Sequence, residues 1–142
     1  LACREVRRVC VVELSPKIVA WNRKHLGNSE ILDDSRTEVV IGDFHDFLHG
    51  NPKSYNGIVI DVDNGSDWVV RKETRRIYSL SMLNLLRIRL RPSGAMGIWA
   101  HAQNKAYERA LEESFGNFDV LNAKDFDLTG RSLDSVIYLV KG

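Results

Sequence analysis

Short apolar runs alternate with amphipathic stretches along this chain. The runs Val9–Leu14, Thr37–Ile41 and Ile58–Ile60 are rich in Val and Ile, and each is followed closely by acidic or turn-forming residues. Such runs are typical of strands that are buried on both faces in a parallel sheet. In the stretches between and after these runs, apolar residues recur at helical spacing. This alternation predicts an α/β domain with a mainly parallel sheet.

Turn-forming residues predict where the helices begin and end. Ser15-Pro16 begins a predicted helix that runs to Leu26, and Gly27 follows as its terminating glycine. Further helices are predicted over 74–91, which ends at Pro92-Ser93-Gly94, and over 103–115. A helical turn is expected over 44–48 and a polar connection over 31–35. The runs 118–121 and 135–140 predict an antiparallel hairpin at the C-terminus.

Composition narrows the class of protein. With 142 residues and 44% apolar content, the chain predicts one domain over 1–142. A net charge of +1 gives no electrostatic reason to expect a nucleic-acid partner. Cys3 and Cys10 lack the spacing of a zinc ribbon or a disulfide framework, which favours a cytoplasmic location. No stretch approaches the roughly 20 apolar residues that cross a bilayer, so we expect no membrane partner.

The first residues do not resemble the start of a domain. The chain begins at Leu1 without a methionine, and residues 1–8 are predicted to be the tail of a helix. The sequence therefore looks like part of a longer, N-terminally truncated protein.

Acidic residues stand at the ends of the predicted strands. Glu13, Asp43, Asp61 and Asp63 each follow an apolar run. Because parallel strands share one carboxyl edge, we expect these side chains at the mouth of a ligand crevice, where a carboxylate can accept ribose hydroxyls. Each acid taken singly also fits a cap or a surface charge, and Asp61 to Asn64 also fit a simple Asx turn. Both interpretations stay open at this point.

The four histidines offer one weak metal signal. His45 and His49 are four residues apart beside Asp46, so they would present two ligands on one helix face. Solvent-facing histidines are the alternative, which applies equally to His25 and His101. We favour the alternative and expect no metal.

Three motifs in order carry a family resemblance over nearly the whole chain. Val11 to Pro16, Val40 to Asp43 and Tyr55 to Asp61 resemble successive motifs of class I S-adenosylmethionine-dependent methyltransferases, and within that fold the spermidine (polyamine) synthases. The segments 77–79 and 90–95 are similar to that group's later helix and its proline-glycine turn. The resemblance implies a Rossmann-like methyltransferase sheet.

The family resemblance also implies roles for individual residues. Glu13 would bind the ribose and Asp43 the adenine amine of S-adenosylmethionine or its decarboxylated form. The remaining expected residues of the cofactor site are Leu14, Ser15, Gly42, Phe44 and Asp61. Asp61 and Asp63 would be catalytic, because a carboxylate attracts and deprotonates an attacking amine. The acceptor, a polyamine or another small molecule, would contact Asn64, Trp68 and Tyr78.

Departures from the family pattern bear on activity. Asn64 stands where polyamine synthases usually carry a second aspartate, and Ser15 stands where they usually carry an acid. The family's glycine-rich loop and its strand, which would lie between the strands at Val9 and Ile58, do not occur in the sequence. We therefore expect a homodimer or larger oligomer that binds the cofactor weakly. The alternative to a transferase is an inactive relative that serves as a binding or oligomerisation module.

Overall fold

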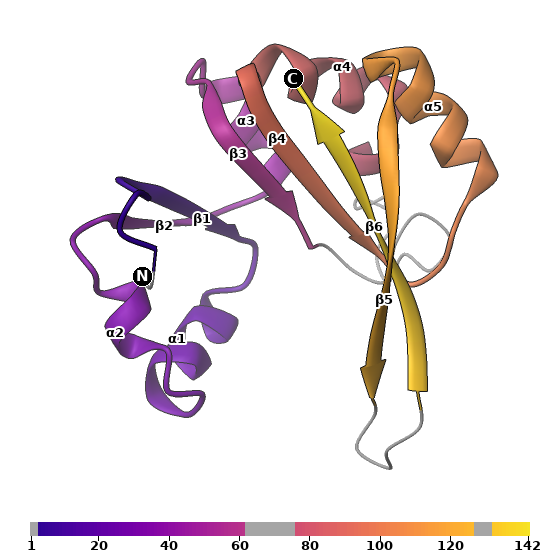
Figure 1. Ribbon diagram of the computed structural model, residues 1–142. Coiled ribbons are helices and arrows are strands. Elements are labelled where there is room, and N and C mark those ends of the chain that lie inside the picture. The colour runs from indigo at the N-terminus through magenta and orange to yellow at the C-terminus, as the bar shows by residue number, and fades with distance from the viewer. Residues whose placement is uncertain (1–2, 62–75, 127–131) are drawn as a thin grey trace. The chain divides into compact units, whose positions relative to one another are not determined.

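The structure is a computed structural model that describes residues 3–61, 76–126 and 132–142 (Figure 1). The chain divides into two compact units, residues 1–51 and 52–142. The predicted α/β class is confirmed, with parallel strand pairs and an antiparallel hairpin at the C-terminus. The single domain expected over 1–142 stays a prediction. None of the described helices is long and apolar enough to cross a membrane.

The first unit is a pair of parallel strands with three short helices. Its elements in order are β1 (Val9–Glu13), α1 (Pro16–Lys24), α2 (Ser29–Leu32), β2 (Thr37–Ile41) and α3 (Phe44–Gly50). In the register of β1 and β2, Val9 lies beside Thr37 and Glu13 beside Ile41. The bounds predicted for β2 are confirmed, as is the start of α1 at Pro16.

Two local predictions for the first unit are wrong. Residues 4–5 form a turn and no helix is present over residues 3–8. The guanidinium of Arg36 donates to the carbonyls of Cys3 and Val6, at 3.3 and 3.2 Å, so this segment is held by a side chain 30 or more positions away. The polar connection predicted over residues 31–35 is wrong at its start, because α2 extends to Leu32. There the Leu32 N–H bonds to the Asn28 carbonyl at 3.0 Å.

The second unit is a four-stranded sheet with two helices. Its elements are β3 (Tyr55–Ile60), α4 (Leu80–Arg89), β4 (Leu90–Ala100), α5 (Lys105–Phe115), β5 (Phe118–Phe126) and β6 (Ser132–Lys141). The strand order is β3-β4-β6-β5. β3 and β4 are parallel, whereas β6 runs antiparallel to both β4 and β5. The predicted C-terminal hairpin is therefore confirmed.

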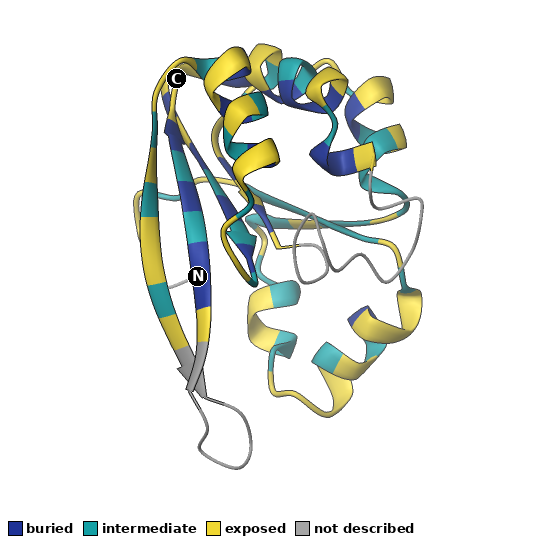
Figure 2. Ribbon diagram, turned by 90° about the vertical axis from the view of Figure 1, so that its right-hand side faces the viewer, coloured by how far each residue is buried: buried dark blue, intermediate teal, exposed yellow. Residues whose placement is uncertain are grey.

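The core of the second unit lies on one face of its sheet. Residues that pair across the strands are buried together on that face, where α4 and α5 add their own apolar side chains (Figure 2). The largest of these fully buried side chains are Ile60, Met82, Leu83, Leu86, Met96, Ile98, Leu111, Tyr138 and Val140. This packing explains why apolar residues recur regularly in the sequence between residues 77 and 111.

The prediction that β3 is buried on both faces is wrong for this unit. Ile58 and Ile60 are buried, but Val59 between them is 83% exposed. The physical reason is the alternation of side chains along a strand. Val59 points to the face of the sheet opposite Ile58 and Ile60, the face on which the buried core does not lie.

The predicted helix over 74–91 is shorter than expected. Residues 76–78 form a 3₁₀ turn, and α4 begins only at Leu80. Ser79 separates the two because its hydroxyl accepts the Met82 N–H at 3.3 Å, which is an N-cap. The helix also ends earlier than Pro92-Ser93-Gly94, because α4 stops at Arg89 and β4 begins at Leu90. The three residues instead form an irregularity inside β4, where Ser93 has a φ of 63°.

Candidate functional site

Glu13 and Gly42 join the carboxyl ends of the two parallel strands in the first unit. The Gly42 N–H donates to the Glu13 carbonyl at 3.0 Å, one residue beyond the β1–β2 ladder. The Glu13 carboxylate accepts the N–H of Ser15, two residues further along the chain, at 2.7 Å. Glu13 and Asp43, predicted from separate motifs, are therefore brought to one edge of this strand pair.

Asp43 shapes the start of α3. Its Oδ1 accepts the N–H groups of His45 and Asp46, at 2.8 and 3.2 Å, so it is the N-cap of the helix. Aspartate is favoured at this position because it satisfies N–H groups that the helix itself cannot. The structure thus assigns Asp43 the capping role that the sequence left as an alternative, and its carboxylate is held at the strand edge by that role.

The neighbours of these two acids flank the same edge. Leu14 is half exposed, and Ser15 is the N-cap of α1 without a side-chain capping bond. Phe44 is half buried as the first residue of α3. Each predicted cofactor-binding residue of the first unit therefore lies within three residues of a strand end.

The predicted catalytic residues fall in the second unit, and only one of them is among the described residues. Asp61 is exposed and follows β3 directly, at the carboxyl end of that strand. Asp63, Asn64 and Trp68 lie outside the described residues.

Tyr78, the remaining predicted substrate contact, is buried in an aromatic cluster. Its ring meets Tyr107 edge-on at 5.3 Å between centroids, and Tyr107 meets Tyr138 at 5.6 Å. Burial raises the pKa of Tyr107 far above its usual value, with smaller contributions from Tyr78 and Tyr138. The ring of Tyr78 therefore contributes to packing, being only 9% exposed.

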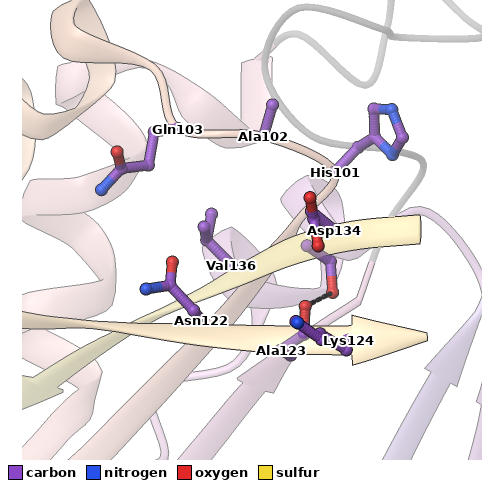
Figure 3. Close-up of a pocket in the computed structure, with 9 residues that line it drawn as sticks. His101, Ala102, Gln103, Asn122, Ala123, Lys124, Asp134 and Val136 are labelled. Carbon is purple, nitrogen blue, oxygen red and sulfur yellow. Dashed lines mark hydrogen bonds between the residues drawn. The ribbon is translucent and has the colours of Figure 1, made fainter. Parts of the chain in front are cut away.

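The structure shows one feature that sequence reasoning missed. A hollow of about 420 Å³ opens where the chain leaves β4, beside the β5–β6 pair (Figure 3). It is lined by His101, Ala102, Gln103, Asn122, Ala123, Lys124, Asp134, Ser135 and Val136. Within it, Ser135 donates to the Ala123 carbonyl at 3.4 Å. Its lining comes from three separate segments, so no local motif marks it in the sequence.

The histidine pair of α3 is brought together as its spacing suggested. The rings of His45 and His49 lie 4.4 Å apart between centroids at a tilt of 46°. His45 Nδ1 also lies 3.2 Å from Asp46 Oδ1.

Comparison with curated proteins identifies polyamine aminopropyltransferases as relatives. The chain is 30% identical over 128 residues to polyamine aminopropyltransferase 2 of Pseudomonas aeruginosa, which covers 81% of this chain and 35% of that protein. It is 26% identical over 98 residues to the polyamine aminopropyltransferase of Sulfolobus acidocaldarius, covering 68% of this chain and 32% of that protein. The chain thus spans about a third of these relatives' length. No family profile matches it.

Comparison with solved structures shows that this chain shares its fold with spermidine synthases and with a methyltransferase-like protein. Spermidine synthase from Thermotoga maritima matches with a TM-score of 0.74 and 16% identity, over 98% of this chain and 47% of that one. A spermidine synthase in complex with the transition-state analogue AdoDATO matches at 0.77, with 15% identity and coverages of 98% and 48%. Human methyltransferase-like protein 13, in complex with SAH, matches at 0.71 with 17% identity, over 92% of this chain and 60% of that one.

Proposed function

Because this chain is a partial relative of the polyamine aminopropyltransferases and has the Rossmann-like methyltransferase fold, we propose that it is part of a transferase that uses an adenosyl-sulfonium donor. The donor would be S-adenosylmethionine or its decarboxylated form. The transferred group would be aminopropyl or methyl, and the acceptor would be a polyamine or another small molecule.

The observation that carries this proposal is the hydrogen bond from the Gly42 N–H to the Glu13 carbonyl, which joins the carboxyl ends of β1 and β2. A carboxylate at the end of a parallel strand can accept two ribose hydroxyls, which is the role we propose for Glu13. Asp43 would accept the exocyclic amine of adenine while its Oδ1 caps α3. Leu14, Ser15 and Phe44 would flank the nucleoside. The donor set present is chemically suited to an adenosine, since both acids are strong hydrogen-bond acceptors.

Asp61 is the residue that we propose beside the acceptor. A bound sulfonium would supply an electrophilic carbon, and an amine attacks such a carbon only in its neutral form. The exposed Asp61 carboxylate would attract the cationic amine and take its proton. Asp63 would share this role, and Asn64 and Trp68 would contact the acceptor.

The nucleoside half of the proposal is tested by binding. Glu13→Gln should weaken the binding of S-adenosylmethionine, its decarboxylated form or methylthioadenosine roughly tenfold or more, because hydrogen bonds to a charged acceptor contribute about 1.5–3 kcal/mol. Isothermal titration calorimetry measures this directly. Glu38→Gln is the matched control, since Glu38 is an exposed glutamate on β2 away from the strand end. Equal affinity in the Glu13 variant and the control would remove Glu13 from the site.

The chemical half is tested by turnover in the full-length protein. Asp61→Asn keeps the shape of the side chain but cannot take a proton, so we expect a fall of about 10²–10⁴ in rate with donor affinity little changed. Normal turnover in this variant would transfer the role to Asp63, which Asp63→Asn then tests.

A second candidate function is supported by the position of β3 at the edge of its sheet. β3 is an edge strand of its sheet, and an apolar edge strand favours pairing with another polypeptide. An inactive relative that acts as a binding or oligomerisation module would use this edge, and we propose a homodimer or larger oligomer in the cytoplasm. Light scattering distinguishes this from a monomer, and a monomer that binds S-adenosylmethionine tightly would exclude the second candidate.

A further inference from the structure

Four potential metal ligands lie along α3 and its cap, three of them close together at the start of the helix. We call Asp43, His45, Asp46 and His49 the α3 cluster. Ligand atoms of Asp43, His45 and Asp46 all lie within 4.8 Å of one another. The imidazole of His49 adds a second ring, 4.4 Å from that of His45. The first unit thus presents two imidazoles and two carboxylates within the seven consecutive residues 43–49.

Local structure explains why these side chains meet. Residues four apart on a helix lie on the same face, which places His49 beside His45. Asp43 is fixed because its Oδ1 accepts the N–H groups of His45 and Asp46. The cap therefore holds one carboxylate beside the turn that carries His45 and Asp46. Little rearrangement of the backbone would be needed to bring these three groups onto one ion.

The spacing within the α3 cluster suits a small transition-metal ion. Zinc bonds to nitrogen and oxygen are about 2.1 Å long, so two ligands of a tetrahedral site end about 3.4 Å apart. His45 Nδ1 and Asp46 Oδ1 are 3.2 Å apart, which is close to that separation. The pair could hold a cation between them with small changes in side-chain torsion.

We propose that the α3 cluster binds one divalent transition-metal ion of the zinc class through His45 and Asp46, with Asp43 and His49 completing the site. Imidazole nitrogen favours zinc, nickel or copper over magnesium and calcium, which prefer oxygen ligands alone. His45 is partly buried and Asp46 is 79% exposed, so an ion can enter from solvent. The site shares Asp43 with the proposed nucleoside site, but its test uses zinc alone and so can fail without affecting the proposed transferase function.

The test is a calorimetric titration of the untagged 142-residue chain with zinc chloride. We expect saturable binding of one ion per chain. His45→Gln and Asp46→Asn should each weaken binding by roughly tenfold or more, because each removes a ligand. His49→Gln should weaken it as well. His25→Gln is the matched control and should bind zinc as the parent does, since His25 is an exposed histidine at the end of α1.

Two results would overturn the proposal. One is the absence of saturable zinc binding in the parent chain. The other is equal affinity in the parent, His45→Gln and Asp46→Asn chains, which would show that the ion binds elsewhere. Circular dichroism checks that each variant is folded. Should His45→Gln fail to fold, Asp46→Asn decides the question alone, because its exposed side chain can be changed with little effect on packing.

Discussion

The hydroxyl of Tyr138 accepts the backbone N–H of Asn104 at 2.8 Å. Tyr138 lies in the middle of β6 and is fully buried, while Asn104 is the N-cap of α5 and accepts the Tyr107 N–H at 2.9 Å. A strand side chain thereby fixes the start of the helix that covers it. The two residues are 34 positions apart, so this contact joins distant parts of the second unit.

Tyr138→Phe tests that contact with a minimal change. The variant keeps the ring but leaves the Asn104 N–H without its partner, which typically costs about 1–3 kcal/mol. We expect the free energy of unfolding to fall by that amount in urea titrations. A variant as stable as the parent would show that another acceptor replaces the hydroxyl.

Leu86→Ala and Ile88→Ala form a matched pair on α4. Leu86 is fully buried, whereas Ile88 is 63% exposed on the same helix. Removing the buried side chain should cost about 2–5 kcal/mol through lost burial and the cavity left behind. The exposed substitution should change stability by less than about 0.5 kcal/mol. Thermal unfolding of both variants measures the difference, and equal effects would contradict the described packing of α4.

Gly94→Ala should destabilise the irregular part of β4. A Cβ at this position would lie 2.8 Å from the Arg91 carbonyl oxygen and 3.0 Å from that of Asn56. The Leu90 side chain lies 2.9 Å away as well, but the two oxygens are backbone atoms, so the strand itself must move, at a cost of about 1–3 kcal/mol. Gly50→Ala is the control, because a Cβ added there would meet nothing within 4 Å. Denaturant midpoints of the two variants should therefore separate clearly.

Asp34 should contribute stability that disappears in acid. Hydrogen bonds from the side chain and backbone of Arg36 hold the pKa of Asp34 well below its usual range. A carboxylate with a lowered folded pKa stabilises the protein above its unfolded pKa, about 3.9, and loses this contribution as pH falls further. Asp34→Asn should therefore lower the melting temperature at neutral pH, and the difference from the parent should shrink below about pH 4.

Asp33→Asn is the control for that pH series. Asp33 pairs with Arg23 at 3.0 Å, but both side chains are more exposed than those of Asp34 and Arg36. Exposed ion pairs contribute little to stability, so this variant should follow the parent closely. A constant difference between parent and Asp34→Asn from neutral pH to pH 2 would contradict the assigned pKa.

Local signals in the sequence predicted much of the fold. The β-branched run at 37–41 predicted β2 to the residue, and Ser15-Pro16 predicted the start of α1. These signals are sufficient because strand propensity and capping depend on neighbours in the chain. Glu13 and Asp43 were also predicted at one edge, since parallel pairing follows from the alternation of strands and helices.

Other features were missed, one because a continuous pattern hid a local cap and others because they depend on groups far apart in sequence. Helical spacing continues through Ser79, so the pattern did not show that its hydroxyl would cap a new helix there. The prediction for Val59 failed because an apolar run does not reveal on which face the helices lie. The hollow beside the β5–β6 pair could not be predicted, because it forms only when three segments pack together.

The aromatic cluster of Tyr78, Tyr107 and Tyr138 has an optical consequence. All four tyrosines of the chain lie after residue 52, whereas the first unit carries only Trp21 among the tyrosines and tryptophans. Buried tyrosine rings in edge-to-face contact are held in fixed, asymmetric surroundings, which produces near-ultraviolet circular dichroism. The tyrosine bands of this chain therefore report the packing of residues 52–142 alone, and the fluorescence of Trp21, isolated by replacing Trp68 and Trp99, would report the first unit separately.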